Sequence, residues 1–147
     1  MIVTARKLAR ASAMKPRQAE LRRSVSTAYY ALFHALAENA ADLLVGVGQS
    51  RENRAWAHVY RALDHGFAKS VCRELGRLPP AVTGCADEFI ELQEIRHKAD
   101  YDPGARFTRA EALDWVSRAE AAIAKLRSAS RHDRKAFGVQ LLLRKRA

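Results

Sequence analysis

Two groups of polar residues have the types and the helical spacing of a candidate functional site. Tyr30 and His34 stand one turn apart on a long helical segment, opposite its apolar residues. Arg96 and Asp100 are also one turn apart on a later segment, and Tyr101 follows directly. Histidine titrates near neutral pH and serves as a general acid or base, while arginine is a permanent cation that stabilises phosphate charge. If the two segments pack together, these side chains form one cluster.

Structural roles would also explain these residues. Tyr30 and His34 would then rim the core or face a neighbouring helix. Arg96 and Asp100 would form an i,i+4 ion pair, worth only about 0.3–0.5 kcal/mol if exposed. A hydrogen-bond network that fixes helix packing or a dimer seam is therefore the alternative to a catalytic site.

The first cluster lies on the most regular helical segment of the chain. At about 100° per residue, one broad apolar arc faces the core. Its members are Leu21, Val25, Ala28, Leu32, Leu36 and Leu43, widened by Tyr29, Phe33, Ala37, Ala40 and Leu44. The opposite side carries Arg23, Thr27, Tyr30, His34 and Glu38. Arg23 thus shares a side with the candidate site, and we include it among the binding residues with Tyr30 and Asp100.

The remaining pattern is helical throughout and predicts an all-α, single-domain bundle of four to five helices. A Thr108–Glu111 capping box opens a long helix, and Ser50 is a candidate N-cap for a third helix. The expected helices cover 4–13, 16–45, 50–66, 67–75, 80–100 and 108–128. We divide the chain into a helical domain, 1–130, and a basic C-terminal tail, 131–147, whose form as helical turn, strand or disorder the sequence leaves open.

Charge is concentrated at the two ends of the 147-residue chain. The net charge is +10, and residues 1–23 and 127–147 each carry seven Lys/Arg against one acid, a balance of +6 at each end. Basic ends bind phosphates through counterion release, pair with an acidic partner or favour solubility. No apolar run approaches the roughly 20 residues of a membrane span, and we expect a cytoplasmic protein without membrane contact. The pattern of the basic N-terminal segment is typical of a first helix and also of an amphipathic targeting peptide.

Metal and cofactor chemistry is not expected. Cys72 and Cys85 lack the close spacing of a metal knuckle and read as buried free thiols. The histidines show no ligand-like pairing, although His58 and His65 would share a face of the third predicted helix. No glycine-rich phosphate loop is present. We therefore predict no metal and no cofactor.

Two segments resemble motifs of the HEPN family of helical proteins. The segment Tyr-Tyr-Ala-Leu-Phe-His-Ala at 29–35 is similar to the Tyr-Tyr-Ala-x-Phe-His-Ala core of one HEPN subgroup. The segment Arg-His-Lys-Ala-Asp-Tyr at 96–101 is similar to its partner motif, Arg-x-x-Ala-Asp-Tyr. The motifs have the order and helical context of the family, and the resemblance covers roughly residues 4–130.

The resemblance implies a helical bundle that is usually a homodimer. Many HEPN proteins pair with a small nucleotidyltransferase-type protein as toxin and antitoxin, and the active members are metal-independent ribonucleases. Their signature is an Arg followed four to six residues later by a His. Here the residues at that spacing from Arg96 include Tyr101 but no His.

The expected function follows from this departure. We expect a HEPN-type module that binds RNA, a nucleotide or a partner protein, in a toxin–antitoxin or stress and defence setting, without intrinsic catalysis. The alternative is a metal-independent ribonuclease with a rearranged catalytic site of His34, Arg96 and Tyr101. Both require the Tyr30–His34 segment to pack against the end of the helix that carries Arg96.

Overall fold

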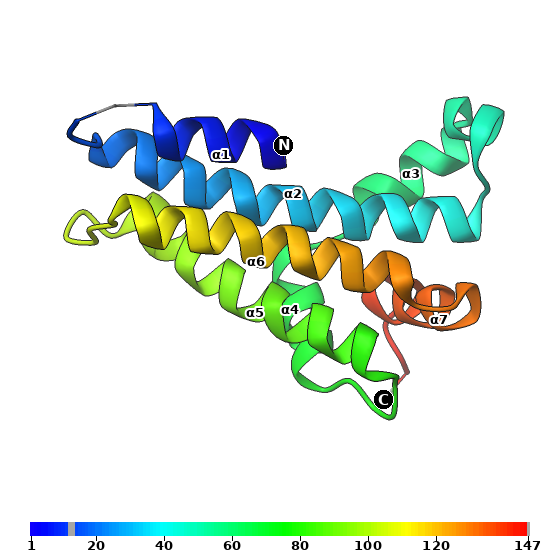
Figure 1. Cartoon of the computed structure of the whole chain (residues 1–147). Coiled ribbons are helices and arrows are strands. Elements are labelled where there is room, and N and C mark those ends of the chain that lie inside the picture. Colours follow the sequence, from blue (N-terminus) through cyan, green and yellow to red (C-terminus); the bar gives the residue numbers. More distant parts are fainter. Residues whose placement is uncertain (12–13, 147) are drawn as a thin grey trace.

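The computed structural model describes residues 1–11 and 14–146, and in these residues all regular structure is helical (Figure 1). Seven α-helices and one 3₁₀ turn, η1, follow one another in the part of the chain that the structure describes. They are α1 (Ile2–Arg10), α2 (Gln18–Leu44), η1 (Gly48–Glu52), α3 (Arg54–Ala62), α4 (His65–Arg73), α5 (Pro80–Tyr101), α6 (Arg109–Ser128) and α7 (Arg131–Leu142). The all-α class predicted from the sequence is confirmed.

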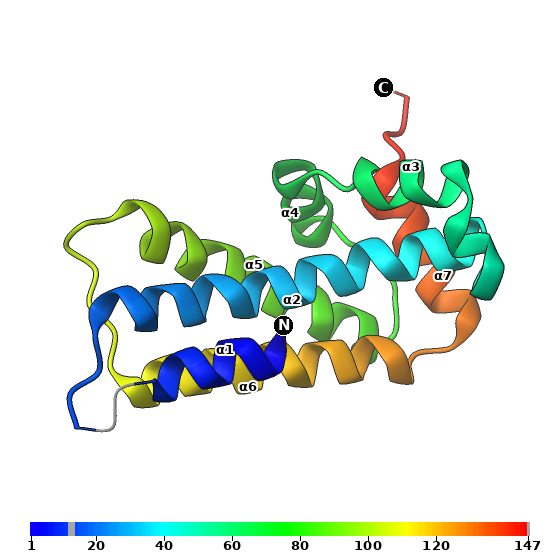
Figure 2. The same cartoon turned by 90° about the horizontal axis from the view of Figure 1, so that it is seen from above.

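The long helices α2, α5 and α6 pack against one another and form the centre of the bundle (Figures 1 and 2). The predicted apolar arc of α2 faces this centre except at its last residue, Leu44, which is 39% exposed at the end of the helix, while Tyr29, Leu32 and Leu36 have no exposed surface. Phe89 of α5 and Val116 of α6 are equally buried. Burial of a large apolar side chain stabilises the fold by about 1.5–3 kcal/mol. This three-helix centre is therefore the framework on which the shorter helices pack.

The short helices cover the two halves of α2. The helix α1 packs along the N-terminal half of α2 and along α6, where the Ser24 hydroxyl donates to the Ala5 carbonyl at 2.7 Å. The helix α7 packs against the C-terminal half of α2, where Gly138 faces Ala40. Because α1 and α7 are well separated along α2, part of the seam between α2 and α6 is left uncovered (Figure 2).

Local sequence signals set several helix ends. The capping box of Thr108 and Glu111 is present at the start of α6, and Pro80 is the first residue of α5. The predicted third helix with Ser50 as its N-cap is wrong. Its residues are divided among η1, α3 and the start of α4, because Asn53 and Asp64 cap the two α-helices with their side chains.

Within the described residues the bundle holds seven α-helices rather than four or five, because α3, α4 and α7 are separate short helices. Residues 131–142, which the sequence analysis assigned to a basic tail, form α7 and pack on the body of the protein. Phe137 and Leu141 are fully buried. The apolar part of this segment therefore belongs to the core, and only 143–146 extend beyond the last described helix.

Both cysteines are buried and free, as predicted. Cys72 lies in α4 and Cys85 in α5, within the same apolar core. Burial raises the pKa of each thiol to about 12. Among the described helices, none is long and apolar enough to cross a membrane.

The contact of α7 with α2 depends on the absence of a side chain at Gly138. A Cβ atom there would lie 3.2 Å from the Cα of Ala40, which is backbone and cannot move aside. We predict that Gly138→Leu lowers the free energy of unfolding by about 1–3 kcal/mol, measured by urea denaturation. Gly84→Leu is the control, because a Cβ at this helical glycine would meet only the flexible side chain of Lys125. Equal effects of the two substitutions would contradict close packing of α7.

Candidate functional site

Arg96 is the centre of the polar cluster, and it joins α5 to α2. Its Nη2 donates a hydrogen bond to the Tyr30 hydroxyl at 2.7 Å. Its Nε lies 2.8 Å from Oδ2 of Asp100, an ion pair without the angle of a hydrogen bond, so Nε is buried without an aligned acceptor. The Ser26 hydroxyl donates to the same Asp100 oxygen at 3.3 Å. The packing that the candidate site requires is therefore present within one chain.

Three aromatic rings surround the Arg96 guanidinium. Its carbon lies 5.2 Å from the ring centre of Tyr30, 5.5 Å from that of Tyr29 and 5.7 Å from that of Tyr101. A cation at these distances is attracted by the electron-rich face of an aromatic ring. The contacts of Arg96 therefore hold one planar cation in a fixed place, with Tyr101 on the solvent side at 64% exposure.

The cluster continues across α2 to α3 as a row of stacked rings. Tyr30 stacks on His34 with ring centres 6.2 Å apart, and His34 stacks on Tyr60 at 5.8 Å. Tyr60 stacks in turn on Trp56 at 5.0 Å, and its hydroxyl lies 2.7 Å from Nδ1 of His34. At the other end, His97 packs on Tyr101.

We call this row the π band; its members are Trp56, Tyr60, His34, Tyr30, Arg96, Tyr101 and His97. Every member is half-buried or exposed, so the band reaches solvent along its length. His34 contacts Tyr30, Phe33 and Tyr60, and Tyr30 in turn contacts Arg96, so the ring of Tyr30 links His34 to Arg96. The structure thus brings Tyr30, His34, Arg96, Asp100 and Tyr101 into one region, without direct contact between His34 and Arg96.

A second histidine, His65, stands beside the cluster on its buried side. Its Nδ1 lies 2.5 Å from the Tyr29 hydroxyl, and its ring stacks on Phe33 at 3.9 Å. Burial raises the pKa of Tyr29 above its usual range, so the phenol stays protonated beside His65. Burial and the neighbouring Arg96 charge lower the pKa of His65, while Asp64 opposes this shift. His65 is therefore held neutral, paired with the Tyr29 hydroxyl.

The sequence analysis missed His65 because it placed this residue at the end of a helix shared with His58. In the structure His58 is in α3 and His65 is the first residue of α4, so the two do not share a helix. Asp64 was the available signal, since an Asp before a helical segment is a favoured N-cap. The described residues contain no group of His, Cys, Asp and Glu that would hold a metal ion.

Arg22 connects α2 to the end of α5, the helix that carries Arg96, whereas Arg23 was the residue predicted to bind a ligand. The Arg22 guanidinium donates to the carbonyls of Ala99 at 3.0 Å, Asp102 at 2.7 Å and Pro103 at 3.1 Å, and also to Ala105. The last carbonyls of a helix have no partner within the helix, and here Arg22 supplies one. Arg23 lies exposed on the next position of α2, and the structure does not bring it into the Arg96 cluster.

The chemical capacity of this site is that of a cation among aromatic rings. Arg96 offers its Nη1, which makes no hydrogen bond within residues 1–11 and 14–146. Comparisons of this chain with known protein families, with curated proteins and with solved structures find no match.

The lowered pKa of His65 makes the fold sensitive to acid. The unfolded chain binds a proton at the ordinary histidine pKa, about 6.5, whereas folded His65 resists protonation until a lower pH. Below pH 6.5 the unfolded state therefore binds more protons, and the free energy of unfolding falls until the folded pKa is passed. We predict that His65→Gln reduces this loss between pH 7.5 and 5.5 in urea titrations. His58→Gln, on the exposed side of α3, should keep the pH dependence of the parent.

Proposed function

We propose that this chain is a HEPN-type helical module that binds single-stranded RNA along the π band and does not cleave it. The observation that carries the proposal is the continuity of the band, from Trp56 on α3 to Tyr101 at the end of α5. The resemblance at residues 29–35 and 96–101 supports the same assignment. It also supports the expected homodimer and the nucleotidyltransferase-like antitoxin partner, which belong to the proposal.

Single-stranded RNA suits this surface for two physical reasons. Unpaired bases stack on aromatic side chains and on Arg planes, which contributes about 1–3 kcal/mol per base. Tyr101 and His97 are exposed and offer such surfaces at one end of the band. Arg96 carries a guanidinium with a free Nη1, which would bind a phosphate oxygen between stacked bases. Arg54 and Arg61, both exposed on α3, add positive charge at the other end.

The absence of cleavage follows from the partners of the titratable groups. Attack by a 2′-hydroxyl needs a base near the attacking oxygen and an acid near the leaving oxygen. His34 is paired with Tyr60 through Nδ1, and it is linked to Arg96 only through the ring of Tyr30. His65 is held by Tyr29 on the buried side. Neither histidine is in contact with the free edge of the Arg96 guanidinium.

Binding is tested with a fluorescein-labelled single-stranded oligoribonucleotide and fluorescence anisotropy. We predict that Arg96→Gln weakens binding by roughly tenfold, equivalent to about 1.4 kcal/mol, and that Tyr101→Leu weakens it at least fivefold through lost stacking, about 1 kcal/mol or more. Tyr101 is exposed, so its substitution leaves the core intact. Arg77→Gln, in the exposed segment before α5, removes the same charge and should have little effect.

Two outcomes would overturn the proposal. The first is equal weakening by Arg77→Gln and Arg96→Gln, which would assign binding to net charge alone. The second is equal affinity for duplex RNA of the same length, because paired bases cannot stack on protein rings.

A metal-independent ribonuclease is the second candidate, because His34, Arg96 and Tyr101 all belong to the π band. We predict that the purified protein leaves total RNA intact in the presence of a chelator. Cleavage that persists with the chelator and is lost in both Arg96→Ala and His34→Ala would establish the ribonuclease instead.

A further inference from the structure

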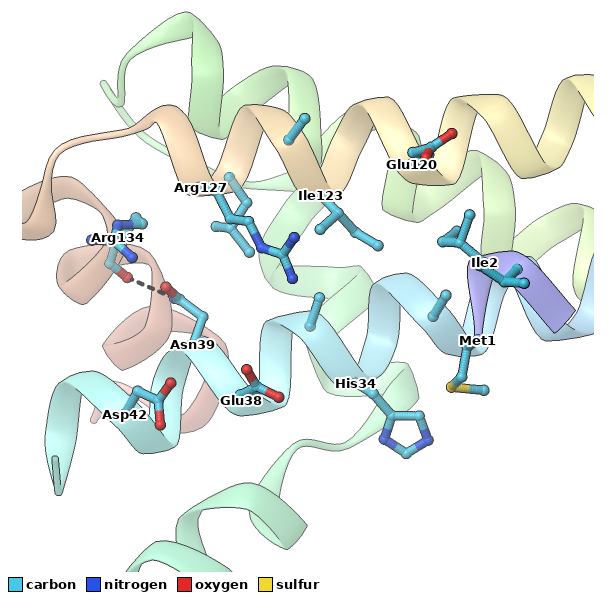
Figure 3. Close-up of a pocket in the computed structure, with 15 residues that line it drawn as sticks. Met1, Ile2, His34, Glu38, Asn39, Asp42, Glu120, Ile123, Arg127 and Arg134 are labelled. Atoms are coloured by element: carbon cyan, nitrogen blue, oxygen red, sulfur yellow. Dashed lines mark hydrogen bonds between the residues drawn. The ribbon is translucent and has the colours of Figure 1, made fainter. Parts of the chain in front are cut away.

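A groove of about 840 Å³ lies in the uncovered seam between α2 and α6 (Figure 3). The first residues of α1 close one end, and Arg134 of α7 stands at the other. The groove shares only His34 with the π band, so it is a separate feature of the molecule. Its volume is in the range of pockets that bind small molecules, about 300–1,000 Å³.

Small apolar side chains form the floor of the groove. Ala31 and Ala35 line it from α2, and Ile123 and Ala124 line it from α6. Ala31 and Ile123 are buried, at 6% and 9% exposure. Alanine methyl groups leave space between the two helices where larger side chains would fill it, so the floor accommodates an apolar body.

The acidic side chains of the groove are all paired with arginines that do not line it. Glu38 lies 3.2 Å and Asp42 2.6 Å from Arg51. Glu120 lies 2.6 Å from Arg6 on α1. Glu38 and Asp42 share the single Arg51, so each carboxylate has an ion-pair partner outside the groove lining, and none of them pairs with Arg127 or Arg134.

The two arginines of the groove have no such partner. In the part of the chain that the structure describes, neither Arg127 nor Arg134 forms an ion pair with a carboxylate. Nε of Arg134 is buried and has no hydrogen-bond acceptor. The Asn39 amide donates to the Arg134 carbonyl at 3.2 Å, which fixes this residue at the groove, and Figure 3 shows the Arg127 guanidinium reaching from α6 over the groove toward α2.

We propose that this groove binds a small organic anion, with one phosphate or carboxylate head on an apolar body. Arg127 and Arg134 bind the head, because guanidinium groups present paired donors that match both kinds of anion. The apolar body lies over Ala31, Ala35 and Ile123. A long polyanion is disfavoured, because Glu38, Asp42 and Glu120 stand along the same groove and repel additional negative charge.

The test uses phenyl phosphate and benzoate as probes, with phenol as the neutral analogue, followed by isothermal titration calorimetry and by NMR shifts of the full chain. We expect both anions to bind and to shift the signals of Ala31, Ala35 and Ala124, and phenol to bind at least tenfold more weakly. The stronger of the two anions identifies the head group. Phenol binding as tightly as the anions would overturn the role of the arginines.

Three variants separate this site from general charge effects. Arg127→Gln, at an exposed position, should weaken binding of the anions by roughly ten- to a hundredfold, as expected for the loss of a hydrogen bond to a charged group. Ala124→Phe, also exposed, should abolish binding by filling the groove while both arginines remain. Arg131→Gln is the charge-matched control, exposed on α7 and outside the groove lining. Equal weakening by Arg131→Gln and Arg127→Gln, or undiminished binding by Ala124→Phe, would exclude the groove as the site.

Discussion

Arg22 reaches from α2 to four carbonyl oxygens at the end of α5 and in the turn that follows it. The Ala99 carbonyl lies in the last turn of α5, where carbonyls have no partner within the helix, and the hydrogen bonds of all four oxygens to one guanidinium hold the two helices in a fixed register. Tyr30 lies two turns along α2 from Arg22, and Arg96 lies just before the bonded end of α5. The Tyr30–Arg96 hydrogen bond and the rings around it therefore depend on this anchor at the end of the bundle.

The helical class and the buried face of α2 follow from local sequence, because helical periodicity is a property of neighbouring residues. All six residues of the predicted apolar stripe, from Leu21 to Leu43, are buried. The helices predicted at 50–66 and 67–75 begin elsewhere in the structure, because Asn53 and Asp64 rather than Ser50 and Gly66 set the starts of α3 and α4, and 48–52 form the separate turn η1. The placement of α7 was missed because it depends on Gly138 against Ala40, a contact between residues distant in the chain.

The residues of the candidate site also fall into those predictable from local sequence and those that depend on tertiary packing. Tyr30, His34, Arg96 and Asp100 were found because each pair repeats at one helical turn. Trp56, Tyr60 and His65 come from α3 and α4, whose positions depend on tertiary packing, and no spacing in the sequence places them beside α2. Arg22 and Arg23 illustrate the same limit at a finer scale. Adjacent residues differ by about 100° around a helix. Whether Arg22 or Arg23 contacts α5 therefore depends on where α5 packs against α2.

The two buried thiols have a practical consequence for chemical labelling. Thiol reagents react with the thiolate, and at neutral pH Cys72 and Cys85 are almost wholly protonated because their pKa values are about 12. They lie in α4 and α5, on elements that pack together. Alkylation of this chain under native conditions therefore requires separation of these helices. The alkylation rate then reports how often the core opens, and no probe has to be introduced.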